Sequence, residues 1–377
     1  MKILPKYKQI ARSLMEKIKS GEYKKNSFLP SENSLTKIYN CSRITIRQAL
    51  SILIRKNVIK TIHGVGSVII KSPEEIVFED EDFLFIDKDE PLSRELQRIG
   101  LLYSKSIKWG IENPFYGEII SSIEKNAKEA GYLLSFAIYE DMKRISDVSE
   151  FIVDNNVVGF ILLGDIERKV VEILKNTGLP LVSVNSPVVE NYKISIVIND
   201  DYRGGYEVGK FLLSIGCERI ACIKAPKNVS SCDIRFEGFL EGLKKNGYNT
   251  SNLIVVEGNL EFDSGYECVK KFFSFHKQVP DGIFCLNDLM AIGAMKYITE
   301  QGLRIPDNIN VIGFDNIAQS AQVFPSLTTV EIQRKKMGEI AVRKLIYHIH
   351  NINKLFSLKV VLPCKLVVRN STRNINS

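Results

Sequence analysis

Several features that mark common enzyme classes are missing from these 377 residues. No G-x-G-x-x-G motif opens a strand-to-helix turn, and Gly204-Gly205 lacks the lysine of a phosphate-binding loop. Only four histidines are present, and His348 and His350 lie two apart on a predicted helix, where they point to different faces. Because no metal set or nucleophile triad is evident, we expect no catalysis, no metal and no cofactor. A carboxylate pair assembled only by folding is the remaining route to an enzyme.

Paired cysteines and long apolar runs are missing too. The seven cysteines are scattered, odd in number and never spaced as C-x-x-C, which indicates buried free thiols in a reducing cytosol. The N-terminus has no apolar signal core, and no run approaches the ~18 apolar residues of a membrane span. These absences predict a soluble, cytoplasmic protein.

Charge is unevenly divided along the chain, whose net charge is +7. Residues 1–72 hold eleven lysines and four arginines against three glutamates, a net charge of +12, so residues 73–377 carry −5. A basic head on a mildly acidic body is typical of a duplex-binding module joined to a separate regulatory domain. Charge alone also fits a head that binds anionic lipid.

Two short helices are predicted within the basic head. Ser31 and Ser42 each precede a helical pattern, where a hydroxyl can accept the free backbone N–H groups of a first turn. The first helix is expected over 32–39. The second buries a stripe at the i, i+3, i+4, i+7 spacing, made of Ile46, Ala49, Leu50 and Leu53. Its outward residues near the N-terminus are Arg43, Thr45, Arg47 and Gln48. This pattern predicts a helix-turn-helix with a recognition helix, and an ordinary solvated face is the alternative.

The flanks of this pair favour the first interpretation. Upstream, a helix that ends at Gly21 buries the stripe Tyr7, Ile10, Leu14 and Ile18. Downstream, β-prone runs at 58–62 and 67–70 enclose His63-Gly64-Val65-Gly66, a hairpin with two glycines at its tip. A glycine-rich tip lets backbone approach DNA closely, and His63 can reach a phosphate or the minor groove. Helix, helix-turn-helix and hairpin together predict a winged helix-turn-helix.

The motifs of residues 5–70 resemble those of the gluconate-repressor (GntR) family of bacterial regulators. They are Tyr7-x-Gln9-Ile10, Leu29-Pro30-Ser31-Glu32, Ser42-Arg43-x-Thr45-x-Arg47-x-Ala49-Leu50 and Gly64-x-Gly66, in order and spacing. The resemblance implies a DNA-binding domain over 1–70. The expected DNA-binding residues are Lys6, Tyr7, Ser31, Glu32, Ser42, Arg43, Thr45, Arg47, Gln48, His63, Gly64 and Gly66. Arg43 and Arg47 are expected to read bases.

An acidic segment follows the head. Nine acidic residues and a single base, Lys88, lie between Glu74 and Glu90, together with several aromatic and aliphatic side chains. We interpret 71–99 as an interdomain linker, which could repel DNA and help to orient the heads. A plain solvated spacer is the more economical interpretation.

From residue 100 onward, strand-length apolar runs alternate with amphipathic helices. The first series has strands at 99–104, 132–138, 158–163 and 181–184 with helices at 116–130, 146–155 and 167–176. The second begins with the strand 195–198 and has strands at 219–223, 253–256, 282–285 and 310–314 with helices at 202–215, 231–246, 263–275 and 288–301. This rhythm predicts an α/β fold with two doubly wound parallel-sheet lobes and a ligand between their strand ends. A helix at 332–352 and strands at 359–369 are expected to complete one lobe each.

Motifs in this region are similar to the effector domain of the lactose/galactose-repressor family, which has the periplasmic-binding-protein-like fold. They are Asn113-Pro114-Phe115-Tyr116, Asp201-x-x-Gly204-Gly205, Asp233-x-Arg235-x-x-Gly238-Phe239, Asn287-Asp288-x-x-Ala291 and Gly313-Phe314-Asp315-Asn316. The resemblance covers essentially 100–370 and implies that the domain 100–377 binds an effector and dimerises. That family's usual head and hinge helix are replaced here by the winged head, and this fusion resembles regulators of the arabinose-repressor type.

The expected effector site lies at the strand ends between the lobes. Sugars are held by planar side chains that pair adjacent hydroxyls and by aromatic faces. The predicted ligand-binding residues are Asn113, Phe115, Asn185, Arg235, Phe262, Asn287, Asp288 and Asp315. Arg235 is favoured because its fork can hold two oxygens. Each carboxylate could instead cap a helix or form an ion pair. For Asp288 the helix cap and the ligand contact are equally favoured, and Asp201 is interpreted as a cap.

Together these patterns predict a transcriptional repressor that binds double-stranded operator DNA as a homodimer and is released by a small sugar, L-arabinose above others. One alternative is a regulator of the same build that answers another sugar or a purine. The second is a two-lobed α/β sugar-nucleotide enzyme with a basic appendage, against which the winged head argues. The operator sequence, the exact effector and the sign of the response are left open.

Overall fold

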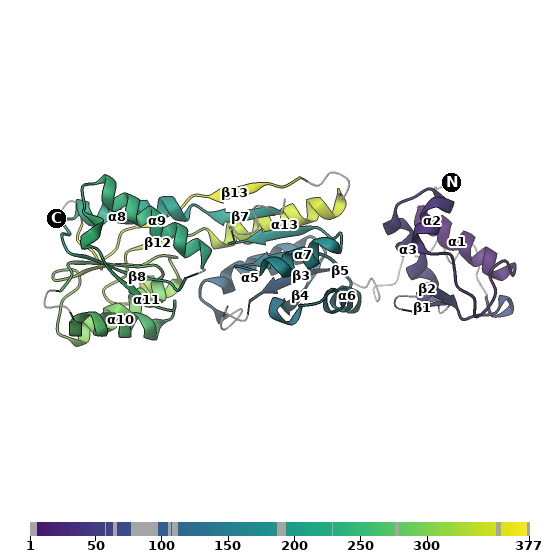
Figure 1. The fold of residues 1–377 in the computed structure, drawn as a ribbon, viewed down its shortest axis with the longest axis horizontal. Coiled ribbons are helices and arrows are strands. Elements are labelled where there is room, and N and C mark those ends of the chain that lie inside the picture. Colours follow the sequence, from purple (N-terminus) through teal and green to yellow (C-terminus); the bar gives the residue numbers. More distant parts are fainter. Residues whose placement is uncertain are drawn as a thin grey trace. The chain divides into compact units, whose positions relative to one another are not determined.

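The structure is a computed structural model that describes residues 6–56, 58–62, 66–76, 97–104, 107, 112–186, 194–227, 229–275, 279–351 and 356–374. The chain divides into two units, Met1–Ser93 and Arg94–Ser377 (Figure 1). The proposed limits of the linker, residues 71 and 99, stay predictions. The other proposed domain boundaries do too. Most of the acidic segment lies outside the described residues.

The described part of the first unit contains helices and one hairpin. Its elements are α1 (Lys6–Lys19), α2 (Glu32–Tyr39), α3 (Arg43–Arg55), β1 (Ile59–Ile62), β2 (Gly66–Ile69) and the short 3-10 turn η1 (Pro73–Glu75). The two strands are antiparallel, with Ile59 opposite Ile69. Asn40 ends α2 in the left-handed conformation (φ 43°), which asparagine tolerates better than most residues. The connection to α3 is therefore short, as a helix-turn-helix requires.

One face of each helix in the first unit is buried, as the sequence pattern predicted. Ile10, Leu14 and Ile18 of α1 pack in the same core as the α3 stripe and the hairpin residue Ile69. Each of these side chains is at most 7% exposed. Burial of one such aliphatic side chain contributes roughly 1.5–3 kcal/mol, so this core holds the three helices in place. The predicted winged helix-turn-helix fold is confirmed, while His63 and Gly64 at the hairpin tip lie outside the described residues.

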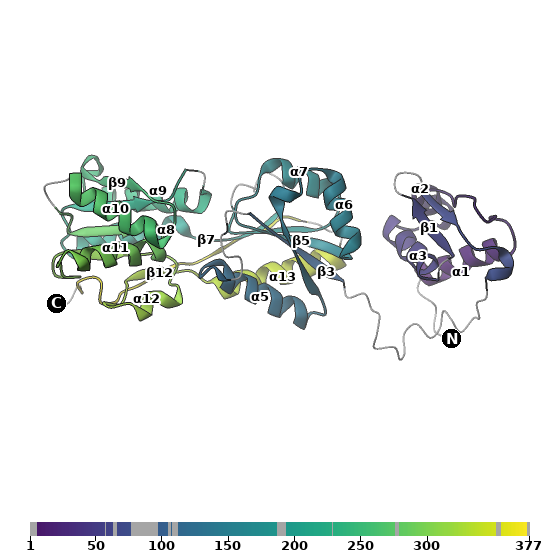
Figure 2. The same cartoon turned by 90° about the horizontal axis from the view of Figure 1, so that it is seen from below.

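A six-stranded parallel sheet forms the first lobe of the second unit. Its strand order is β13-β7-β6-β5-β3-β4, with bounds β3 (Arg98–Tyr103), β4 (Leu133–Ile138), β5 (Val157–Leu163), β6 (Leu181–Val184), β7 (Ser195–Asn199) and β13 (Lys359–Leu362). Its helices are α5 (Tyr116–Glu129), α6 (Ile145–Asp154), α7 (Arg168–Asn176) and α13 (Arg334–His350), with a 3-10 turn at Tyr139–Asp141. Helices α5 and α13 cover one face, and α6 and α7 cover the other (Figure 2).

A four-stranded parallel sheet of order β11-β10-β8-β9 forms the second lobe. Its strands are β8 (Ile220–Lys224), β9 (Ile254–Glu257), β10 (Gly282–Cys285) and β11 (Asn310–Ile312). Its helices are α8 (Asp201–Ser214), α9 (Ser230–Lys245), α10 (Phe262–Phe275), α11 (Asp288–Glu300) and α12 (Ala318–Gln322), with a 3-10 turn at Thr250–Asn252. Two further strands, β12 (Thr329–Glu331) and β14 (Lys365–Val367), pair antiparallel beside it.

The assignment of 195–198 to the second lobe was wrong. This segment is β7, which pairs with β6 on one side and β13 on the other, so it belongs to the first sheet. The predicted region 359–369 likewise divides between the lobes, as β13 and β14. The chain thus passes between the lobes three times: after β7, before α13 and after β13 (Figures 1 and 2). Alternation of strands and helices predicts a parallel sheet, but it does not indicate which sheet a strand joins.

Candidate functional site

The N-terminal half of α3 presents an exposed, donor-rich surface. The side chains of Arg43 and Arg47 are 57% and 60% exposed, and Gln48 is exposed beside them. Thr45 is half-buried. The opposite face of the helix is held in the core, so these side chains are fixed on one outward surface. This is the arrangement that lets a recognition helix enter a DNA groove.

Glu32 of α2 holds both arginines in place. Nε of Arg43 lies 2.5 Å from Oε2 of Glu32, and Nε of Arg47 lies 3.0 Å from each of its carboxylate oxygens. Partial burial alone would raise the pKa of Glu32, but the hydrogen bonds from Arg43 and then Arg47 hold this pKa below its ordinary value. Glu32 was predicted to contact DNA, and here it orients the two arginines.

The other predicted DNA-binding residues have varied positions. Ser31 and Ser42 cap α2 and α3: their hydroxyls accept from the backbone N–H of Ser34 and Thr45, each at 3.2 Å. Lys6 is exposed and Tyr7 is half-buried. Gly66 is the first residue of β2. His63 and Gly64 lie outside the described residues, so any contact from the tip stays a prediction.

A buried cation, Arg235 of α9, lies at the centre of the candidate effector site. Its Nε and Nη2 donate to Oδ1 of Asp201 at 3.2 and 2.8 Å, and Nη1 donates to the carbonyl of Leu286. Nη1 also lies 3.5 Å from Oδ1 of Asp315, and the guanidinium lies 3.5 Å from the ring centre of Phe314. Arg235 is only 3% exposed. All three nitrogens of its guanidinium therefore already donate to protein groups, so Arg235 does not present a free pair of donors to a ligand.

Close packing of two helices positions this cluster. A Cβ on Gly205 of α8 would lie 2.0 Å from the carbonyl oxygen of Arg235, and one on Gly238 of α9 would lie 2.0 Å from the carbonyl oxygen of Tyr202. Glycine at both positions lets the backbones of α8 and α9 approach each other. The approach brings Asp201 of α8 within hydrogen-bonding distance of Arg235.

The interpretation of Asp201 as a helix cap was wrong. The cap of α8 is Asp200, whose Oδ1 accepts from the backbone N–H of Arg203 at 3.0 Å. Asp201 is 4% exposed and pairs with Arg235. Burial raises its pKa, although Arg235 opposes the effect. The sequence did contain a signal: of two consecutive acids at a helix start, only one can be the cap.

Asp315 is the carboxylate of this cluster with the clearest capacity to respond to a ligand. It is 6% exposed, and its backbone φ of 114° is rare for a residue other than glycine. Burial raises its pKa to about 7, although Arg235 and Arg334 both act to lower it. Such a group can change its charge near neutral pH when its surroundings change.

Asn287 and Asp288 tie the second lobe together. The side chain of Asn287 caps α11 by accepting from Met290 N–H at 3.0 Å and donates to the carbonyl of Leu260 at 2.7 Å. Since Asn287 is the cap, the alternative that Asp288 caps this helix is wrong. Asp288 is fully buried and accepts from Ile317 N–H at 2.9 Å and from Thr329 Oγ1 at 2.5 Å. Burial, and then Asp315, raise its pKa well above its ordinary value.

The first lobe contributes the other predicted side chains. Oδ1 of Asn113 accepts from the backbone N–H of Phe115 and of Tyr116, each at 3.0 Å, at the start of α5. The ring of Phe115 is half-buried and edge-on to that of Tyr116, with centres 4.8 Å apart. Asn185 is buried, and its Nδ2 lies 3.5 Å from Oη of Tyr116. Tyr116 was not predicted, and burial raises its pKa well above the ordinary value.

Asp165 joins the two lobes directly. It follows β5 of the first lobe, and its carboxylate accepts from the backbone N–H of Ser230 at 2.8 Å and from its Oγ at 2.6 Å, at the start of α9. Oγ of Ser186 donates to the same carboxylate at 2.8 Å. The charges of Asp165 and Asp315, from different lobes, both act on Tyr116. The structure thus joins Asp165 of the first lobe to the start of α9, the helix that carries Arg235, a contact that no sequence motif indicated.

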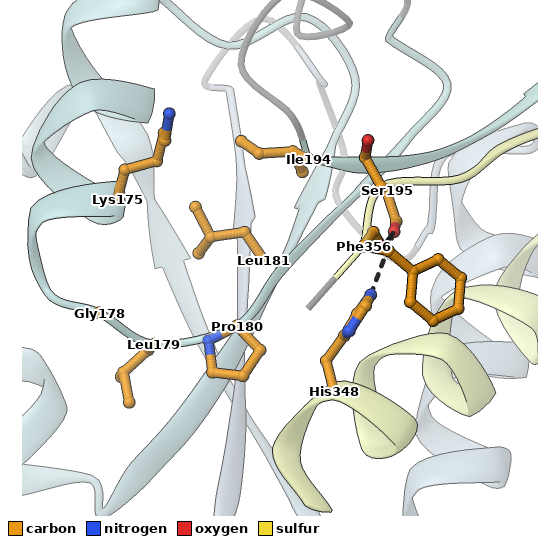
Figure 3. Close-up of a pocket in the computed structure, with 10 residues that line it drawn as sticks. Lys175, Gly178, Leu179, Pro180, Leu181, Ile194, Ser195, His348 and Phe356 are labelled. Carbon is orange, nitrogen blue, oxygen red and sulfur yellow. Dashed lines mark hydrogen bonds between the residues drawn. The ribbon is translucent and has the colours of Figure 1, made fainter. Parts of the chain in front are cut away.

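Two further features lie outside this cluster. Phe262 begins α10, and Nζ of Lys296 on the neighbouring α11 lies 5.8 Å from its ring centre, so its contact with a ligand stays a prediction. A hollow of about 450 Å³ opens at the N-terminal ends of the first-lobe strands β6 and β7 (Figure 3). There Nε2 of His348 lies 3.1 Å from Oγ of Ser195. Neither feature contributes to the Arg235 cluster.

The described part of the chain also bears on metal binding and membrane insertion. No group of three or more histidine, cysteine or acidic side chains is placed there to hold a metal ion. Among the helices described, none combines the length and the apolar character needed to cross a bilayer.

Comparison with known proteins identifies the family. Residues 6–69 match the model for bacterial regulatory proteins of the gntR family, and residues 210–372 match the model for a periplasmic binding protein-like domain. The HTH-type transcriptional regulator DegA of Bacillus subtilis is 32% identical over 275 residues, covering 71% of this chain and 80% of DegA. The HTH-type transcriptional repressor PurR of Pasteurella multocida is 30% identical over 280 residues, 73% of this chain and 81% of PurR. This chain belongs to the LacI family of transcriptional regulators.

Solved structures agree with this LacI-family assignment. A LacI family transcriptional regulator from Enterococcus faecium with bound ribose has a TM-score of 0.63 at 27% identity, and the match covers 73% of this chain and 98% of that one. The regulator CelR in its cellobiose complex has a TM-score of 0.65 at 24% identity, covering 73% and 84%, and supports the fold alone. This chain is a LacI-family regulator with a gntR-type DNA-binding head, and the relatives are named as regulators, not as enzymes.

Proposed function

We propose that this chain is a repressor that binds operator DNA as a homodimer through α3 and releases it when a small sugar occupies the site between the lobes. The observation that carries the effector part is the buried Arg235, which pairs with Asp201 and Asp315 and lies on a helix whose first residue bonds to Asp165 of the first lobe. On this proposal L-arabinose is the first candidate, because the fusion of a winged head to this effector domain resembles arabinose-repressor-type regulators.

The chemistry of the cluster supports a polyhydroxylated ligand. A sugar presents adjacent hydroxyls that both donate and accept, and charged partners form the stronger hydrogen bonds with them. Asp315 offers acceptors from the second lobe, and Asn185 and Tyr116 offer polar atoms from the first. A ligand that contacts both lobes favours the arrangement in which they are together, and it shifts the protein only by its difference in affinity for the two states.

Two solved LacI-type structures lend support to a sugar over other small molecules. The Enterococcus faecium regulator holds ribose, and a regulator from Alkaliphilus metalliredigens, 25% identical with a TM-score of 0.61, is complexed with D-xylulofuranose. Both ligands are five-carbon sugars. We infer that a pentose is the class to test first, with hexoses and purines as the alternatives.

The experiment has two steps. Thermal unfolding of the full chain is recorded with pentoses, hexoses and purines, and stabilisation should follow RT ln(1 + [L]/Kd) for the ligand that binds. Fluorescence anisotropy then measures binding to the DNA upstream of the chain's own gene, with and without that ligand. We expect release of DNA with no chemical change in the ligand. A sugar consumed during the assay would instead favour the sugar-nucleotide-enzyme alternative.

Two variants test the effector site itself. Asp315→Asn keeps the shape of the side chain and should weaken sugar binding while operator binding persists. Arg235→Ala leaves Asp201 as an uncompensated buried charge, which typically costs about 3–5 kcal/mol, so the unfolding temperature of the second unit should fall. Normal release of the Asp315→Asn protein by the sugar would contradict the site.

A further inference from the structure

Arg334, the first residue of α13, joins parts of both lobes through one guanidinium. Its Nε donates to Oε2 of Glu118 at 2.5 Å, in the first turn of α5. Its Nη1 donates to the carbonyl of Asp315, and Nη2 donates to the carbonyl of Asn316 at 2.9 Å. Arg334 is 7% exposed, so these bonds are shielded from water and cannot be exchanged freely for it.

The two carbonyls belong to a backbone segment that needs support. Asp315 and Asn316 have φ values of 114° and 51°, a region of backbone conformation that residues other than glycine rarely adopt. Such a conformation persists only where neighbouring groups hold it. Arg334 supplies two of the bonds that do so, and Nη2 of Arg369 adds a third by donating to Oδ1 of Asn316 at 2.6 Å.

The carboxylate at the other end of the contact stays charged. Burial alone would raise the pKa of Glu118, but Arg334 and then Lys335 hold this pKa below its ordinary value. Nζ of Lys335 lies 3.4 Å from Oε1, although its own side chain is 81% exposed. A charged acceptor makes the stronger kind of hydrogen bond with a guanidinium, so α5 and the Asp315 segment are linked through one buried arginine.

We propose that Arg334 is a positioning residue that couples the two halves of the effector site by fixing the Asp315–Asn316 backbone to the first turn of α5. Both ends of this contact adjoin candidate effector residues: Asp315 is one, Phe115 is the N-cap of α5, and Tyr116 begins the turn that holds Glu118. A ligand that alters the Asp315 segment therefore also shifts α5, on which the first-lobe side of the site is built. The proposal rests on the proposed function, because it needs a ligand to act at Asp315.

The first test needs no ligand. Amide hydrogen exchange is measured on the full chain carrying Arg334→Gln, with Arg343→Gln as the matched control. Arg343 lies on the same helix, and its side chain is 75% exposed where it pairs with Glu339. Loss of Arg334 should accelerate exchange about tenfold in both segments 115–119 and 313–318, because opening of one would no longer be opposed by the other. Acceleration confined to 313–318 would overturn the proposal, as would the same pattern in the control.

The second test measures coupling with L-arabinose and D-ribose as probes. Calorimetry gives the sugar affinity, and DNA anisotropy gives the operator affinity with and without saturating sugar. Arg334→Gln should keep sugar affinity within about threefold, while the factor by which sugar weakens operator binding falls from about tenfold or more towards one. Arg334→Lys, which retains a cation for Glu118 but lacks the fork, should lie between. Glu118→Gln should resemble Arg334→Gln, and the double variant should be no worse than either.

Two outcomes contradict the coupling role. Full release of the Arg334→Gln protein by sugar would show that the contact transmits nothing. If the Arg334→Gln protein lost sugar affinity and sugar-induced release of operator DNA to the same extent, Arg334 would be part of the binding site and would not couple its two halves. A parent protein that answers neither sugar counts against the proposed function alone, and the exchange measurement still decides the role of Arg334.

Discussion

At the scale of single residues, Glu32 determines how the two candidate base-reading arginines are held in the free protein. Glu32 pairs with Arg43 and Arg47, and both arginine side chains are more than half exposed. Exposed ion pairs of this kind contribute at most about 1 kcal/mol each. The arginines can therefore exchange the carboxylate for base edges at little cost, while their orientation is set beforehand.

We predict that Arg43→Ala and Arg47→Ala each weaken operator binding by about 1–3 kcal/mol and relax specificity at one base pair. The loss follows from removal of a bidentate donor at the start of α3. Anisotropy at fixed salt measures the effect, and Arg12→Ala on α1, a half-buried arginine paired with Glu16, is the control. Unchanged affinity in both α3 variants would remove this helix from the recognition surface.

Asp315 predicts how stability depends on pH. Its pKa of about 7 in the folded chain lies above the ordinary value of 3.8, so the folded state binds the proton more tightly than the unfolded state. The resulting stabilisation is fully present below about pH 4 and is lost as pH rises through 7. Relative to Asp315→Asn, the unfolding temperature of the parent protein should therefore fall as pH rises through this window. Equal slopes in the two proteins would contradict the raised pKa.

At the scale of elements, local signals predicted the helix ends well. The range 32–39 was expected for the first of the paired helices, and α2 runs from Glu32 to Tyr39, because the Ser31 hydroxyl caps it within the same turn. The prediction of which sheet β7 joins was wrong, because that choice does not depend on local signals. Its neighbours, β6 and β13, are separated from it by very different lengths of chain, and nothing in the strand itself names them.

The candidate site was predictable mainly for residues that lie in recognisable motifs. Arg235 and Asp315 lie in such motifs and do meet, at 3.5 Å. Tyr116 was missed because its contact with Asn185 joins distant segments of the first lobe, and Asp165 because its contact with Ser230 joins the two lobes. A sequence gives each lobe its pattern, but it contains no local mark for the contact that forms when two lobes meet.

The packing of α8 on α9 gives an element-scale prediction. Gly205→Ala would place a methyl group 2.0 Å from the Arg235 carbonyl oxygen, which is backbone and cannot turn aside. We expect a loss of about 1–3 kcal/mol in the free energy of unfolding, seen in denaturant titrations, together with weaker sugar binding as α9 moves. Lys210→Ala, on the exposed side of α8, should change neither quantity. Unaltered stability of the Gly205 variant would show that the helices can separate without cost.

At the scale of the whole molecule, one head is too small to specify an operator by itself. Two-fold symmetric proteins read half-sites spaced by about one helical turn, ~10 bp, or its multiples. We predict that the full chain sediments as a dimer at micromolar concentration and that a shortened chain of residues 94–377 does so too. A monomeric 94–377 chain would place the dimer contact in the first unit instead.

The three passages of chain between the lobes have a mechanical consequence. A domain tethered by one strand can tumble about that point in any direction, whereas three separate tethers block sliding and leave mainly rotation about one axis. Few orientations are then lost when a ligand draws the lobes together, so little of its binding energy is spent on ordering them. Sugars of modest size, with few atoms to contribute, gain most from such a scaffold.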